Sequence, residues 1–335
     1  MHIPSPLTTL ALIATTTLPV LSTDLPIRTI YQFSSNDTWL ENLAVRSNGI
    51  ILATEIGPPA NLLAFDPRSP SPKKHILHTF DSVLGLSGIT EAAHDIFYVT
   101  GANTTSANID DPPKNATHVW RVDFNIGNGT APEITLIARP TAPTGFNGLA
   151  AFNETIILAS ASYQDSIFAV DTTTGYTWEA IKQTNLMSSI NGLKIQDGFV
   201  YWTAGGDLYR ALLYNNVTAG VGELIVKGTS FDDFAIAPDG FRAGNGRKYV
   251  YAATAAENTI MEISFDLEGG ENRTEVVAGD LDSTEIAEPT GCAFGRGEGE
   301  VNVLYVTTGG GSAVAVDVDG VDVAVGAQLL GIRLG

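Results

Sequence analysis

The chain has 335 residues, of which 44% are hydrophobic and 16% are charged, and its net charge is −19. This composition indicates a globular protein with a substantial core and excludes long disordered charged regions. The negative charge would repel polyanions, so we expect neither nucleic acid nor an anionic lipid surface as a partner. We expect a monomer.

The first 22 residues have the features of a signal peptide. Residues 7–22 are apolar, are too short to span a bilayer comfortably and end in small residues. We therefore expect secretion or the secretory pathway, with residues 23–335 forming one domain. No later segment has 18 uninterrupted apolar residues, so we predict no membrane span. Seven N-x-[ST] sequons predict glycosylation at Asn36, Asn103, Asn115, Asn128, Asn153, Asn216 and Asn272.

The rest of the chain repeats one pattern six times. Each repeat opens with a polar residue that leads into a β-type run, and a second run, a turn rich in small residues and a third run follow. The opening steps are residues 41–45, 87–91, 147–151, 191–195, 232–236 and 289–294. Repeats of about 40–60 residues built from short strands are typical of β-propellers. We predict an all-β fold, a six-bladed propeller with four antiparallel strands in each blade.

In chain order, residues 27–33 form the first predicted strand, and no repeat includes it. Third runs follow at 61–66, 118–124, 166–171, 207–213, 259–266 and 312–318, and outer strands at 75–80, 133–139, 177–181, 223–228 and 274–279. The sixth repeat lacks a clear outer strand. Propellers often pair one terminus into the last blade, which removes an exposed edge. We predict that residues 27–33 close the propeller, although residues 327–334 compete for that place.

The polar residues that open the repeats should meet in the central channel, because the innermost strands all run the same way along it. They are Glu41, Ser87, Asn147, Asn191, Asp232 or Asp233, and Thr290. Two carboxylates with amide oxygens suit Ca²⁺, Mg²⁺ or Mn²⁺ better than Zn²⁺. Spacing alone leaves open that these residues only cap strand ends. Cys292, the single cysteine, falls in a predicted innermost strand and should be a buried hydrophobe.

The segments ENLAVRSNGIILAT, NGL, DDFAIAPDG, EPTGCAFGR and LYVTTGGG resemble those of SMP-30/gluconolactonase-like six-bladed propellers, and are most similar to a secreted fungal branch. The resemblance covers the chain after the signal peptide. It implies a divalent metal held by Glu41, Asn191 and Asp232, and a substrate-facing Asn147. This chain has Asp232-Asp233 where Asp-Gly is usual, and the lactonases' basic substrate-binding residue has no obvious counterpart.

The resemblance implies two activities. A lactonase would use the metal to polarise an ester carbonyl and a ring carboxylate as base. Similar fungal propellers act in secondary metabolism as hetero-Diels–Alderases, which join a tropolone-derived quinone methide to a terpene alkene such as humulene. That reaction needs two apolar partners held face to face and an acid–base pair that expels water.

We predict the cycloaddition, with apolar small molecules as substrates and no cofactor required for that step. The predicted catalytic residues are Glu41 and Asp232, and the predicted substrate-binding residues are Ser87, Asn147, Asp233 and Thr290. Lactone hydrolysis and non-catalytic binding are the alternatives, since a fold does not determine a function.

Overall fold

The computed structural model describes residues 25–126, 131–242, 246–267 and 269–335. Within them the chain is all β, apart from two single 3₁₀ turns, η1 (Ser106–Asn108) and η2 (Ala255–Glu257). Among these residues no helix is long and apolar enough to cross a membrane. The predicted signal peptide, residues 1–22, lies outside the described part of the chain.

Four antiparallel strands that follow one another in sequence form each of three sheets. These are β10 (Leu149–Ala151), β11 (Ile156–Ala161), β12 (Ser166–Asp171) and β13 (Thr177–Ile181); β14 (Ile190–Gln196), β15 (Phe199–Ala204), β16 (Asp207–Leu212) and β17 (Glu223–Val226); and β18 (Phe234–Ile236), β19 (Arg247–Ala253), β20 (Thr259–Asp266) and β21 (Arg273–Gly279).

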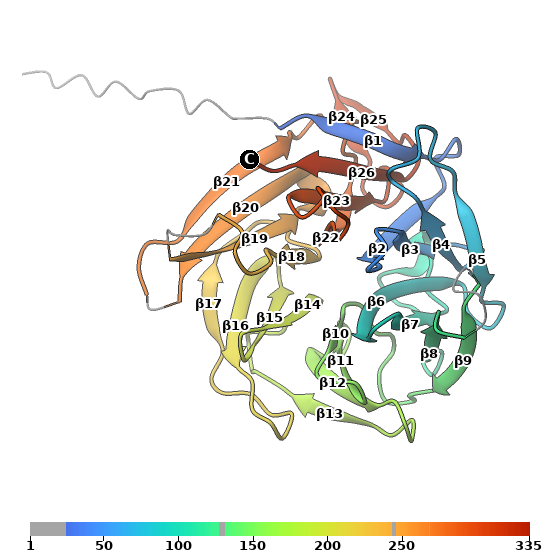
Figure 1. Cartoon of the computed structure of the whole chain (residues 1–335), viewed down its shortest axis with the longest axis vertical. Helices are drawn as coiled ribbons and strands as arrows, with labels where there is room; N and C mark the ends of the chain where they lie inside the picture. The colour runs from blue at the N-terminus through green and yellow to red at the C-terminus, as the bar shows by residue number, and fades with distance from the viewer. Residues whose placement is uncertain (1–24, 127–130, 243–245, 268) are drawn as a thin grey trace, which may run out of the picture.

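Two further groups of four strands are linked into one larger sheet by a single residue pair, Ile56 with Gly85. The first group is β2 (Trp39–Val45), β3 (Ile51–Ile56), β4 (Asn61–Phe65) and β5 (His75–Thr79), and the second is β6 (Gly85–Ala93), β7 (Ile96–Ala102), β8 (His118–Asp123) and β9 (Glu133–Ala138). Figure 1 shows all these strands arranged around a common centre, with β2, β6, β10, β14, β18 and β22 (Pro289–Phe294) nearest to it. The fold is therefore propeller-like.

The two ends of the chain meet in the last sheet. Its order is β22, β23 (Val303–Thr308), β26 (Gln328–Arg333) and β1 (Ile27–Gln32), so the N-terminal strand lies at the outer edge. The prediction that residues 27–33 close the fold is confirmed. β26 does not compete for that place, because it is the third strand and pairs with both β23 and β1.

The prediction that residues 312–318 form the third strand of this sheet was wrong. Gly310 and Gly311 have φ of +67° and +81°, a left-handed backbone that turns the chain out of the sheet. Residues 316–323 instead form a separate hairpin of β24 (Val316–Val318) and β25 (Val321–Val323). That segment alternates valine with aspartate, whereas β26 is buried at five of its six residues. Burial of the more apolar segment thus decides which one joins the sheet.

The apolar core lies between neighbouring sheets. One cluster joins Tyr201 and Leu208 of one sheet to Phe234 and Val250 of the next. Strands buried on both faces read as continuous apolar runs, and all six residues of β3 are buried.

Six of the seven predicted glycosylation sites lie on segments that connect strands. Exposed sequon asparagines are Asn36, Asn115, Asn153, Asn216 and Asn272, Asn103 is half-buried, and Asn128 lies outside the described residues. Nδ2 of Asn272, the atom that would carry a glycan, donates a hydrogen bond to the carbonyl oxygen of Ile225.

Candidate functional site

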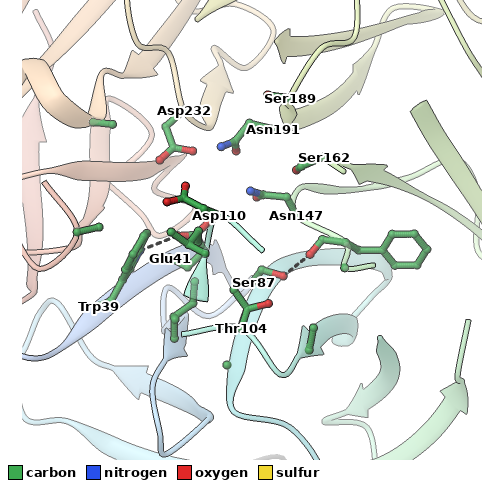
Figure 2. A pocket seen from close by; sticks show the side chains of 18 of the residues that line it. Trp39, Glu41, Ser87, Thr104, Asp110, Asn147, Ser162, Ser189, Asn191 and Asp232 are labelled. Atoms are coloured by element: carbon green, nitrogen blue, oxygen red, sulfur yellow. Dashed lines mark hydrogen bonds between the residues drawn. The ribbon is translucent and has the colours of Figure 1, made fainter. Parts of the chain in front are cut away.

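A cavity of about 510 Å³ lies where the innermost strands begin. Five of the predicted ring residues line it, each from a different repeat: Glu41, Ser87, Asn147, Asn191 and Asp232. Figure 2 shows the side chains of Glu41, Asn147, Asn191 and Asp232 pointing toward one another across this space. The structure thus brings together positions that are up to 191 residues apart in the sequence.

A repeated hydrogen-bond pattern aims these side chains. A hydroxyl on the second strand accepts the backbone N–H that follows the ring residue: Asn42 N donates to Thr54, and Gly192 N donates to Thr203, at 3.0 and 2.8 Å. The same hydroxyls also donate to the backbone carbonyl oxygen of the next ring residue. Thr54 donates to Ser87 O at 2.6 Å, and Thr203 donates to Asp232 O at 2.5 Å. Each hydroxyl therefore ties one ring position to the next.

Glycine follows three of the five ring residues that line the cavity, because the innermost strands nearly touch there. A Cβ on Gly148 would lie 2.7 Å from the carbonyl oxygen of Asn191, and one on Gly192 would lie 2.5 Å from Oδ1 of Asp233. The backbone of Gly148 also donates to Asn191 O at 3.3 Å. A glycine directly after the polar residue therefore allows neighbouring innermost strands to approach closely. The same close approach sets the spacing of the ring residues.

Three buried oxygens of the ring have no hydrogen-bond partner among the described residues: Oδ1 of Asn147, Oδ1 of Asn191 and Oδ1 of Asp232. Buried polar atoms are nearly always paired, so each exception needs an explanation. All three are acceptors. A ligand with hydrogen-bond donors, or a cation, would satisfy them.

Burial raises the pKa of the carboxyl groups in this cavity. The pKa of Glu41 rises to about 8, mainly through burial and further through the charges of Asp233 and Glu288, while a 2.7 Å hydrogen bond from Trp39 Nε1 works in the opposite direction. The pKa of Asp232 is raised well above its usual value by burial and by the neighbouring carboxylates. Proximity of like charges and loss of water thus favour the protonated forms.

Glu288 is a further acidic group of the site, and sequence reasoning missed it. It lines the cavity and is only 3% exposed, and burial raises its pKa to about 7. The available signal was its position, since it directly precedes Pro289 at the start of the sixth repeat. Asp110, Ile109 and Tyr163, which also line the cavity, come from connecting segments that carry no repeat signal.

Asp233 and Thr290 do not line this cavity. Asp233 accepts hydrogen bonds from Asn42 Nδ2 at 2.6 Å and from Lys194 Nζ at 2.6 and 2.7 Å. The Thr290 hydroxyl donates to the carbonyl oxygen of Leu40 at 2.6 Å. Both side chains hold the innermost strands together. Cys292 is buried, and burial raises the pKa of its thiol.

The same cavity also has an apolar wall. Trp39, Ile56, Ala102 and Val314 line it, whereas Leu86 is fully buried and the ring of Phe146 packs in the core against Phe168. The Ser87 hydroxyl donates to the carbonyl oxygen of Phe146 at 2.6 Å, which ties β6 to the segment before β10 (Figure 2). The cavity can therefore hold a molecule with an apolar part and a part rich in hydrogen-bond donors.

The ring also offers the oxygen ligands that a hard divalent cation prefers. Within the described ranges, no group of three or more His, Cys, Asp and Glu residues is placed to hold a metal. The ring, however, combines the carboxylates of Glu41 and Asp232 with the unpartnered amide oxygens of Asn147 and Asn191. Carboxylate and amide oxygens are ligands that Ca²⁺ and Mg²⁺ accept, so these residues fit such an ion.

Two curated relatives cover most of the chain, whereas no family model matches it. A protein of Phoma sp, provisionally named a hetero-Diels–Alderase, is 29% identical over 90% of this chain and 91% of its own length. The protein asR5 of Sarocladium schorii, also provisionally named a hetero-Diels–Alderase, is 27% identical over 84% of this chain and 78% of its own length.

Solved structures share the fold at low identity. The major allergen Mala s 1 of Malassezia sympodialis has a TM-score of 0.61 at 11% identity, covering 92% of this chain and 95% of its own. Regucalcin of Agrobacterium tumefaciens, described as a calcium-binding protein, has a TM-score of 0.59 at 14% identity, covering 94% and 98%. These likenesses support a propeller-like fold and carry no information on activity.

Proposed function

We propose that this protein binds apolar small molecules in the cavity and catalyses hetero-Diels–Alder coupling of a tropolone-derived quinone methide with a terpene alkene. One observation carries the proposal: the apolar residues Trp39, Ile56 and Val314 line the same cavity of about 510 Å³ as a buried acidic ring. Cavities of about 300–1,000 Å³ with a few polar groups are typical of small-molecule sites. The two relatives provisionally named hetero-Diels–Alderases support the choice of reaction.

The residues would divide the work between positioning and proton transfer. The apolar wall would hold the alkene against the diene, since orientation supplies most of the catalysis of a cycloaddition. Formation of the diene from a hydroxymethyl tropolone breaks one C–O bond and releases water. Glu41 and Asp232 would give a proton to the leaving hydroxyl and accept the proton of the ring hydroxyl. Asn147 and Asn191 would accept hydrogen bonds from the substrate through their unpartnered oxygens.

Metal-dependent lactone hydrolysis is the second candidate, and the three unpartnered oxygens favour it. Glu41, Asn191 and Asp232, with Asn147 beside them, would hold a divalent cation such as Ca²⁺, Mg²⁺ or Mn²⁺. A cation there would polarise a lactone carbonyl. A non-catalytic binding propeller is the third candidate.

Two parallel assays separate these candidates. Purified protein is incubated with a hydroxymethyl tropolone and humulene, and separately with aldonolactones and a divalent metal. The proposal expects a faster reaction and a single dominant stereoisomer of the adduct. Metal-dependent lactone opening with no effect on adduct yield or stereochemistry would replace the proposal with the lactonase. Inactivity in both assays would leave the binding protein.

We also propose the finer architecture. The single pair between Ile56 and Gly85 supports counting the larger sheet as two blades, which gives six blades of four strands. A signal peptide at residues 1–22, passage through the secretory pathway and a monomeric state complete the proposal.

A further inference from the structure

The segment that follows β23 forms part of the cavity wall although little in its own sequence would order it. Residues 309–313 are three glycines, a serine and an alanine. Ala313 and Val314 line the cavity, and both are exposed. Such a segment has few large side chains and high backbone entropy, so its position depends on bonds to other parts of the chain.

Glu288 supplies bonds at both ends of the segment, and between them Gly310 donates to Ala287 O at 3.0 Å and accepts from Val325 N at 2.8 Å. Gly309 N donates to the carbonyl oxygen of Glu288 at 2.7 Å. The carboxylate accepts the backbone N–H of Ala313 on Oε2 at 3.2 Å and that of Val314 on Oε1 at 3.0 Å. The backbone N–H groups of Gly311 and Ser312 also lower the pKa of this carboxyl, against the larger effect of burial. One buried carboxylate thus faces several consecutive backbone donors.

The local backbone is built for this contact. Glu288 has φ of +54°, a backbone conformation that residues other than glycine rarely adopt. Its own N–H donates to Oδ1 of Asn258 at 2.8 Å, which helps to hold it there. A Cβ on Gly309 would lie 2.7 Å from Cδ of Glu288, so only glycine leaves room for the carboxylate. Strained backbone that the surroundings hold in place often marks a functional position.

We propose that Glu288 is a positioning residue that fixes residues 309–314 as one wall of the cavity, so that the side chain at position 314 selects substrates by shape. The selectivity part of this inference rests on the proposed function. The positioning part depends only on the hydrogen bonds of Glu288.

Hydrogen–deuterium exchange of the full chain without substrate tests the positioning. Glutamine at position 288 keeps the shape but turns an acceptor into an N–H₂ donor that faces backbone donors. At pH 8, where a carboxyl with a pKa of about 7 is mostly ionised, we expect Glu288→Gln to speed exchange of the peptide covering residues 309–316 by about tenfold or more, because charge-assisted bonds are lost. Exchange elsewhere should change little. The matched control is Glu285→Gln, which removes an exposed carboxylate three residues earlier and should leave exchange unchanged.

A second variant covers the case in which Glu288→Gln fails to fold. Gly309→Ala keeps the charge but places a Cβ against the carboxylate, and φ of Gly309 lies outside the positive range, so the backbone tolerates alanine. It should speed exchange in the same peptide. Unchanged exchange in Gly309→Ala, or in a folded Glu288→Gln, would overturn the positioning role, whatever reaction the protein catalyses.

Substrate competition tests the selectivity. Val314→Phe should lower kcat/KM for humulene relative to a smaller alkene by about tenfold, the low end of the range for a change of one methylene group in an apolar pocket. An unchanged ratio would overturn the selectivity role. If wild-type protein forms no adduct, the proposed function fails, and the exchange experiment still decides the positioning role.

Discussion

Glu41→Gln should make the stability of the metal-free protein less dependent on pH. Glu41 is 5% exposed, and its pKa is about 8 in the fold against an ordinary value of 4.5. Between those two values the unfolded chain binds fewer protons at this position than the folded chain. The free energy of unfolding therefore falls as pH rises, and glutamine, which does not titrate, removes that contribution.

The size of the effect follows from the shift. One proton gives a slope of about 1.4 kcal/mol per pH unit, which amounts to about 3–4 kcal/mol between pH 5 and pH 8. Glutamine keeps an oxygen that can accept the Trp39 Nε1–H bond, so the packing of the indole is preserved. Compared with wild type, the variant should gain stability steadily as pH rises over this range.

Urea unfolding at pH 5, 6, 7 and 8 with a metal chelator measures the difference. The chelator matters because a bound cation would lower the pKa of Glu41 and hide the effect. The control is Glu133→Gln, which removes a carboxylate from an exposed position of β9 and should leave the slope unchanged. Parallel pH profiles for wild type and Glu41→Gln would refute the view that burial keeps this carboxyl protonated.

Three further predictions follow from individual contacts. Asp95→Asn removes an ion pair in which Arg46 Nε and Nη2 donate at 3.0 and 2.9 Å, and should cost about 2 kcal/mol at pH 7 in urea unfolding. Because Arg46 lowers the pKa of Asp95, wild type should lose this contribution as pH falls below about 4, and an unchanged midpoint for the variant would contradict it. Gly192→Ala places a Cβ 2.8 Å from Cα of Asp233 and should lower stability by about 2 kcal/mol; a neutral result would mean that the innermost strands can separate freely. After expression through a secretory route, peptide mass spectrometry should find glycans on exposed sequons such as Asn36, Asn153 and Asn216; unmodified asparagine at all of them would contradict the predicted secretory route.

The ring was predictable because its signal is periodic. The steps Asn147-Gly148 and Asn191-Gly192 recur at equivalent points, and equivalent points of a propeller meet at one height. The sequence left open whether Asp232 or Asp233 faces the cavity. The structure resolves this by the alternation of side chains along an extended chain: Asp232 lines the cavity, and Asp233 turns to Lys194.

The role of Glu288 could not be predicted, because it depends on backbone donors that return to it about 25 residues later. Neither the left-handed backbone of Glu288 nor the turn at Gly310 has a periodic signature. The same turn removed residues 312–318 from the last sheet, an outcome that rests on comparing the burial of two segments. The local sequence pattern of either segment does not show which of the two is more deeply buried.

A crystal structure with the cycloadduct, or with an inert analogue of it, tests the central claim most directly. The account predicts density for the adduct in the cavity, with its hydrocarbon part against Trp39 and Ile56. Its oxygen atoms should lie within hydrogen-bond distance of the polar groups of Glu41, Asn147, Asn191 or Asp232. Density for the adduct at another place on the protein, or an empty cavity at a saturating concentration of adduct, would contradict it.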